Sequence, residues 1–337
     1  MNEAQVATAA KHINDILSLA MEITPQTRVL VVADKDCALA DTLKTAYLQC
    51  LPQADYFVFN DHAPEFFIEK FQAYPASSLV VLIQTTSFRL NAFRLRVELF
   101  NQQLKVIEHP HLGRMVGEEV NYYLDALAYD ASYYRTVGPA LKTKLDQAAG
   151  GVVDSDHALL HFDTRFESAK LNIGDYTGMK NVGGQFPIGE VFTEACELEA
   201  VHGRVNIFAF GDTKFSVNKT ETPITLIIEA GRVVGTENTT PEFERVLENI
   251  RSDEGEVWVR ELGFGLNRAF TRERVVTDIG TYERMCGVHL SLGAKHSMYR
   301  KPQFTRSTAR HHVDVFAAVK QVRLDNEVVY EHGQWVV

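Results

Sequence analysis

The chain has 337 residues, of which 45% are hydrophobic and 23% are charged, a composition typical of a folded globular protein. Asp and Glu number 44 against 34 Lys and Arg, so the formal net charge of -10 argues against a nucleic acid or an anionic membrane as main partner. There is no leader-like start, no apolar run of the roughly 20 residues that span a bilayer, and no Cys-x-x-Cys pair. We therefore expect a cytoplasmic protein with reduced cysteines.

The first 150 residues alternate between short apolar runs and amphipathic segments. Strands are predicted at residues 27–33, 56–59, 78–83 and 104–108, and helices at residues 4–20, 38–50, 64–73, 90–102 and 115–150. Because short β-branched runs between helices are typical of a parallel sheet covered on both faces, residues 1–150 are predicted to form an α/β domain with a mostly parallel sheet.

This N-terminal domain carries no recognised cofactor motif. The first strand is followed by Ala33-Asp34-Lys35-Asp36-Cys37, so the glycines of a dinucleotide fingerprint are missing, and there is no phosphate-binding loop with a Gly-Lys-Ser/Thr ending. His109 and His111 flank a proline at a strand end, but two histidines define no site, and we interpret them as structural or solvent-exposed. The domain is predicted to be a scaffold or to gate substrate entry.

After Gly150-Gly151 the sequence changes to short strands and turns. Strands are predicted at residues 157–162, 168–172, 205–210, 257–259 and 313–319, hairpins at residues 223–237 and 328–337, and one helix at residues 241–252. Thr240 is a suitable N-cap for this helix, and Pro241 suits its first position. Residues 151–337 are therefore predicted to form an α+β C-terminal domain.

Five side chains in this half are candidate ligands of a divalent metal: Glu190, Glu261, His289, His312 and Asp314. Each lies in a short apolar segment, and the first three have glycines nearby. Carboxylate oxygens and imidazole nitrogens are ligands for zinc and related ions. Residues two apart on a strand point to one face, so His312 and Asp314 can bind together.

Each candidate also has a structural alternative. Glu190 follows Pro-x-Gly and can be a solvated turn residue, and Glu261 can form an ion pair with Arg260 or Arg268. His289 can be a hydrogen-bonded core histidine. His311 can take the place of its neighbour in the last pair.

In chain order the segments read Pro-x-Gly-Glu-Val-Phe, Glu-x-Gly-x-Gly-x-Asn, Gly-x-His-x-x-x-Gly and His-x-Asp. This series resembles the thermophilic metallo-aminopeptidase family, of the aminopeptidase T type, over the second half of the chain. The resemblance implies a two-domain metal-binding exopeptidase, often a homodimer, that removes N-terminal residues from short peptides. It implies paired divalent ions (zinc, cobalt or manganese) on the counterparts of the five candidates, with Glu261 as both ligand and general base.

The chain departs from this family in two places. The family has a catalytic tyrosine shortly after the histidine of the third motif, whereas this chain has His296 seven residues after His289, and the nearest tyrosine is Tyr299. His296 and Tyr299 are therefore the candidates for that catalytic position. Residues 193–197 also lack an expected proline.

Two further functions follow from the same residues. Relatives that resemble dihydroxypyridine ring-cleaving dioxygenases hold one iron(II) with two histidines and a carboxylate, and His312 and Asp314 suit that chemistry as well. That class has a histidine where this chain has Glu261, so we favour the hydrolase. The missing tyrosine also fits a catalytically degenerate, peptide-binding partner in a biosynthetic pathway.

Overall fold

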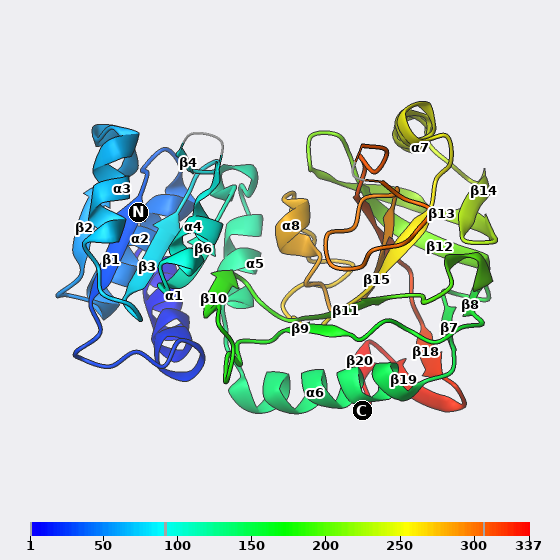
Figure 1. Ribbon diagram of the computed structural model, residues 1–337, viewed down its shortest axis with the longest axis horizontal. Coiled ribbons are helices and arrows are strands. Elements are labelled where there is room, and N and C mark those ends of the chain that lie inside the picture. The colour runs from blue at the N-terminus through cyan, green and yellow to red at the C-terminus, as the bar shows by residue number, and fades with distance from the viewer. Residues whose placement is uncertain (1, 91–92, 306) are drawn as a thin grey trace. The chain divides into compact units, whose positions relative to one another are not determined.

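The computed structural model describes residues 2–90, 93–305 and 307–337, and Figure 1 shows its helices and strands. The chain forms two compact units, of which the first comprises residues 1–135 and 174–188 and the second residues 136–173 and 189–337. The boundary that we predicted after residue 150 lies inside the second unit, and as a division into folding domains it stays a prediction.

The first unit is built on a five-stranded sheet in the order β10-β6-β3-β1-β2, and each neighbouring pair is parallel. Its strands are β1 (Val29–Ala33), β2 (Asp55–Val58), β3 (Leu79–Ile83), β6 (Lys105–His109) and β10 (Gly183–Gln185). Every residue of β1 and β3 is buried, as expected for apolar runs in a sheet covered on both faces. The predicted α/β domain with a parallel sheet is confirmed.

The helices of this part are α1 (Glu3–Asp15), α2 (Ala38–Cys50), α3 (Pro64–Gln72), α4 (Leu95–Asn101) and α5 (Glu119–Ala126). A short antiparallel pair, β4 (Arg89–Leu90) and β5 (Phe93–Arg94), precedes α4. Residues 91–92, which fall in the helix predicted at 90–102, lie outside the described residues. The long helix predicted at 115–150 is two helices, α5 and α6 (Ala131–Gln147).

Alternate strand residues of the first unit form one apolar cluster. Leu30, Val32, Val80 and Leu82 pack with Phe67 of α3, because side chains two apart on a strand point to the same face. This burial stabilises α3 against the sheet.

His109, at the end of β6, is a buried structural residue. Tyr47 Oη lies 2.8 Å from its Nε2, Tyr123 Oη lies 2.8 Å from its Nδ1, and Tyr123 donates to the Phe186 carbonyl at 3.0 Å. A neutral imidazole with its proton on Nδ1 satisfies this chain of hydrogen bonds. Burial lowers the pKa of His109 to about 3, which keeps it neutral.

The second unit contains a large, curled antiparallel sheet. Among the described residues it has 13 strands in the order β20-β19-β18-β7-β8-β12-β17-β16-β15-β11-β9, with β13 beside β12 and β14 beside β13. The strands are β7 (Gly151–Asp154), β8 (Leu159–Phe162), β9 (Lys170–Asn172), β11 (Glu190–Glu194), β12 (Val201–Gly211), β13 (Val217–Glu229), β14 (Arg232–Glu237), β15 (Val259–Gly265), β16 (Gly287–Leu292), β17 (Val313–Ala317), β18 (Gln321–Leu324), β19 (Glu327–Glu331) and β20 (Gln334–Trp335).

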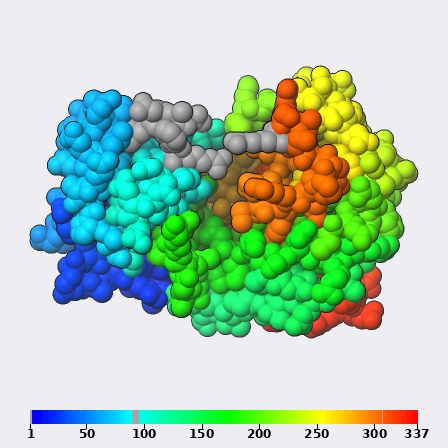
Figure 2. All heavy atoms as spheres, in the orientation of Figure 1, coloured from blue at the N-terminus to red at the C-terminus, as the bar shows by residue number. Residues whose placement is uncertain are grey.

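Two helices follow strands of this sheet, α7 (Pro241–Glu254) and α8 (Ile279–Tyr282). Thr240 caps α7 by accepting a hydrogen bond from the Phe243 N–H, as predicted. The chain after β16, drawn in orange, reaches the surface on the face shown in Figure 2. None of the helices in the described part of the chain is long and apolar enough to cross a bilayer.

Candidate metal centre

Three neighbouring strands of the second unit each direct one candidate ligand to the same place. Glu190 begins β11, Glu261 lies in β15 and His289 lies in β16, and β15 pairs with both other strands. His289 lies opposite Gly263, and Glu190 lies opposite Gly265. Gly263 leaves space for the His289 ring, whereas Gly265 allows the backbone of Arg284 and Met285 to approach β15 closely.

A bulge in β15 positions Glu261. The register between β15 and β16 shifts between Val259 and Leu262, so the chain carries one extra residue there. The Glu261 N–H donates to Ser291 Oγ at 2.9 Å, which satisfies a backbone group that the bulge removes from the regular ladder. After the bulge, Glu261 and Gly263 share a face.

The three side chains form a buried cluster of opposite charges. His289 Nε2 lies 3.4 Å from Glu190 Oε1 and 3.4 Å from Glu261 Oε1, and one ligand atom from each residue lies within 4.8 Å of the others. Glu190 is 5% exposed, Glu261 7% and His289 1%. Buried carboxylates are costly without a cation. The cluster therefore needs a positive charge.

Part of that charge comes from Arg284, which the sequence analysis did not identify. Its Nη1 lies 3.3 Å from Glu190 Oε2, and the same guanidinium pairs with Glu283. Burial raises the pKa of Glu190 more than the charges of Arg284 and His289 lower it. Arg284 has no recognisable motif around it, and only the packing of the chain before β16 reveals its role.

The neighbouring carboxylates also change the pKa of His289. Burial lowers its pKa, but the hydrogen bond with Glu261 and the charge of Glu190 outweigh burial, so the net shift is upward. The net effect of these neighbours thus favours a proton on the ring. A bound ion would replace that proton.

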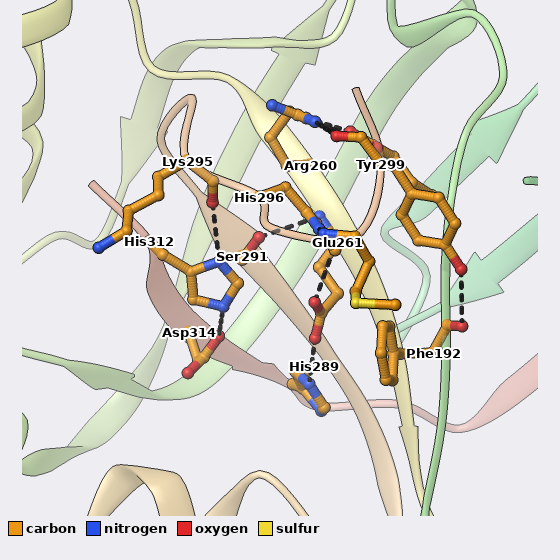
Figure 3. Close-up of polar contacts among 12 residues, drawn as sticks. Phe192, Arg260, Glu261, His289, Ser291, Lys295, His296, Tyr299, His312 and Asp314 are labelled. Atoms are coloured by element: carbon orange, nitrogen blue, oxygen red, sulfur yellow. Dashed lines mark hydrogen bonds and ion pairs between the residues drawn. The ribbon is translucent and has the colours of Figure 1, made fainter. Parts of the chain in front are cut away.

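His312 and Asp314 form a second pair in the same unit (Figure 3). His312 Nε2 lies 3.1 Å from Asp314 Oδ1, and its Nδ1 lies 3.0 Å from the Lys295 carbonyl. The carbonyl can only accept, so Nδ1 carries a proton and Nε2 faces the carboxylate. Burial lowers the pKa of His312, but the charge of Asp314 raises it to about 10. His312 lies just before β17, where Asp314 lies, so only Asp314 is in the strand.

His296 contacts the other side of the Glu261 carboxylate. Its Nε2 lies 2.9 Å from Glu261 Oε2, and its Nδ1 accepts a hydrogen bond from the Met298 N–H at 3.2 Å. When neutral, His296 therefore carries its proton on Nε2, facing Glu261. Burial would raise the pKa of Glu261, but the contacts with His289 and His296 lower it well below its usual range.

Tyr299 does not occupy this position. Its hydroxyl donates to the Ser168 carbonyl at 2.8 Å and lies 3.4 Å from the Phe192 carbonyl (Figure 3), and burial raises its pKa. The structure thus brings His296, and not the Tyr299 hydroxyl, next to Glu261. The catalytic roles of both residues stay predictions.

The structural alternative for Glu190 is wrong, and so is the pairing of Glu261 with Arg260. Glu190 is buried and is not a solvated turn residue. Arg260 forms a buried ion pair with Glu194 and not with Glu261.

The donor set fits a divalent metal. The ligand atoms are carboxylate oxygens and imidazole nitrogens, which zinc and related ions accept. Asp314 Oδ1 and His296 Nε2 are also buried, and each lies at ion-pair distance from a partner, His312 Nε2 and Glu261 Oε2, but without regular hydrogen-bond geometry. A polar ligand or ion is a suitable further partner for such atoms.

Comparisons with known proteins bear on the fold. No protein-family model matches the sequence, and no curated protein matches it. The solved structure of wild-type AmpT from Thermus thermophilus matches with a TM-score of 0.60 and 12% sequence identity, over 98% of this chain and 99% of that chain. The chain therefore shares its fold with AmpT over nearly its whole length.

Proposed function

We propose that this protein is a metal-dependent hydrolase that releases N-terminal residues from short peptides. The observation that carries this proposal is the buried convergence of Glu190, Glu261 and His289. The fold shared with AmpT supports it, because this fold is compatible with aminopeptidase chemistry. Fold alone does not determine function, so the site carries the argument.

Two divalent ions, zinc, cobalt or manganese, are the proposed cofactors. Their ligands would be the five predicted residues: Glu190, Glu261, His289, His312 and Asp314. When bound, such ions polarise a peptide carbonyl and lower the pKa of a bound water. Side chains of the protein would transfer the proton and compensate the charge of the carboxylate ligands.

Glu261 is the proposed general base. As a carboxylate beside the other candidate ligands, it would accept a proton from the attacking water and pass it to the leaving amine. His296 directs its Nε2 toward the second carboxylate oxygen and holds the side chain in place. Arg284 offsets the charge of Glu190.

Metal analysis combined with a dipeptide panel tests this function. Purified protein should hold roughly two divalent ions per chain, and their removal by a chelator should abolish hydrolysis. Glu261→Gln should abolish hydrolysis while the circular dichroism spectrum is unchanged. Glu248→Gln, at an exposed position of α7, is the matched control and should keep full activity.

Two outcomes would replace the hydrolase. One tightly bound iron per chain, together with oxygen uptake on a hydroxylated pyridine, would assign a ring-cleaving dioxygenase. Full metal loading without cleavage of any dipeptide would assign a peptide-binding partner that has lost catalysis.

A further inference from the structure

A cavity of about 960 Å³ lies in the second unit beside His296. Its walls come mainly from the chain that follows β16. Five basic side chains line it, and the described residues of its wall include no Asp or Glu: Arg260, Lys295, Arg300, Lys301 and Arg310. In a chain with a net charge of -10, this is a local reversal of charge.

Two of these cations have no carboxylate partner among the described residues. The other three have carboxylate partners: Arg260 pairs with Glu194, Lys301 with Glu167 and Arg310 with Asp253. Lys295 and Arg300 are exposed, and their side chains form no ion pair with any residue that the structure describes. They leave a positive charge facing solvent.

The cavity also has an aromatic wall. The ring of Phe304 packs edge-on against Trp258 with 5.4 Å between centroids, and the Arg260 guanidinium carbon lies 4.6 Å from the centroid of Phe304. Tyr299 lines the cavity as well. Apolar walls with a few placed charges are typical of small-molecule sites. The expected ligand is an anion with an apolar body.

His296 connects this cavity to the candidate metal centre. His296 lines the cavity, and the Nε2 of its buried ring lies 2.9 Å from Glu261 Oε2. One residue therefore contacts both the cavity and the proposed general base. Arg260 holds the wall in place through hydrogen bonds to the Ala294 and Tyr299 carbonyls.

We propose that this cavity binds the C-terminal carboxylate of a short peptide, with Lys295 and Arg300 as the anion-binding residues. That the ligand is the substrate rests on the proposed function, whereas the preference for a carboxylate rests on the cavity alone. Recognition of the far end of the substrate restricts the enzyme to peptides that span the distance from the metal centre to the cavity.

Calorimetry with 3-phenylpropanoate and its uncharged amide tests the cavity without turnover. Each compound is titrated into the full-length protein, once loaded with metal and once after treatment with a chelator. In both states the acid should bind about tenfold more tightly than the amide, because charge-assisted hydrogen bonds to Lys295 and Arg300 favour it. The double variant Lys295→Ala/Arg300→Ala should lose this preference.

The matched control is Lys214→Ala/Arg323→Ala, which removes the same two charges from exposed positions outside the cavity. It should bind the acid as the wild type does. Equal affinity for acid and amide, no detectable binding, or an unchanged preference in the Lys295/Arg300 variant would overturn the proposal. If the acid binds only in the presence of metal and the Lys295/Arg300 substitutions leave its affinity unchanged, its carboxylate binds the metal ion. This result would also overturn the proposal.

Hydrolysis of three dipeptides distinguishes the source of the carboxylate. The KM of Ala-Phe should rise about tenfold on amidation of its C-terminus, and the Lys295/Arg300 variant should remove this difference. If Ala-Asp amide has as low a KM as Ala-Phe, the cavity binds an acidic side chain, and the C-terminal assignment is wrong. Absence of hydrolysis with intact calorimetric preference would count against the proposed function and leave the anion site standing.

Discussion

At the scale of single residues, the candidate centre depends on the absence of a side chain at Gly263. A Cβ atom there would lie 2.1 Å from both Cε1 and Nε2 of His289. No imidazole can remain in place at that distance, since the ring is rigid and is buried. The glycine in Glu-Leu-Gly therefore makes room for a ligand on the adjacent strand.

Gly263→Ala should displace His289 and lower zinc affinity by at least about tenfold, a typical loss when a ligand is misoriented. Overpacking should cost about 1–3 kcal/mol in the free energy of unfolding, so the fold should survive. Zinc affinity is measured by competition with a chromophoric chelator. Gly235→Ala in β14 is the control, because its Cβ would meet Ile227 only at ordinary contact distance. Unchanged zinc affinity in Gly263→Ala would exclude His289 as a ligand.

For single residues, the sequence predicted the site best where a potential metal ligand has glycines nearby. Glu190, Glu261 and His289 are predicted from their motifs and converge in the structure. Arg284 was missed, because one arginine beside a glutamate looks like any surface residue. The contact between His296 and Glu261 depends on the path of the chain after β16. The spacing of residues along the sequence does not predict that path.

At the scale of elements, the C-terminus of α7 holds the segment that lines the basic cavity. Glu254 Oε2 accepts a hydrogen bond from the Ala294 N–H at 2.7 Å, and Oε1 accepts from the N–H groups of Arg310 and His311 at 2.6 Å each. One carboxylate thus ties both ends of the segment that carries His296.

Glu254→Ala should loosen this segment. Three N–H groups lose a charged acceptor, and we expect a decrease of about 2 kcal/mol in the free energy of unfolding because the site is partly solvated. Hydrogen exchange measured by mass spectrometry should rise in peptides that cover residues 294–311. Glu248→Ala on the exposed face of the same helix should leave that exchange unchanged. Equal hydrogen exchange in the two variants would show that the Glu254 hydrogen bonds do not hold this segment in place.

Element prediction succeeded where local signals were strong. The start of α7 follows from Thr240 and Pro241, whereas its end lies at Glu254, two residues beyond the predicted one. The strands β11 and β16 were not predicted, and β15 is longer than the predicted strand at 257–259. Gly263 and Gly265 lower the intrinsic strand preference of β15, and burial between two partner strands compensates for it.

At the scale of the whole chain, the two sheets differ in how far the sequence reveals them. Continuous apolar runs identify four strands of the parallel sheet, but the fifth, β10, was not predicted. Gly183 is required there because its φ is +99° and a Cβ would lie 1.9 Å from the Val106 carbonyl oxygen. The order of the antiparallel strands depends on pairings such as that of β12 with β17, which join distant segments and leave no local pattern.

His109 should make the stability of the chain depend on pH. Its pKa is about 3 in the folded state and near 6.5 when unfolded, so below pH 6.5 only the unfolded chain binds this proton. The free energy of unfolding therefore falls as pH falls, by about 1.4 kcal/mol per pH unit from this group, until about pH 3.

Replacing this imidazole removes that dependence. His109→Gln should destabilise the protein at pH 7, because the buried bonds to Tyr47 and Tyr123 are disturbed. Between pH 7 and pH 5, however, it should lose about 2 kcal/mol less than the wild type does, since glutamine binds no proton. Urea unfolding at the two pH values measures this difference. His332→Asn, at a side chain that is 91% exposed and with a left-handed backbone that Asn tolerates, should behave as the wild type. Equal pH dependence in wild type and His109→Gln would show that the buried imidazole is not held neutral by the fold.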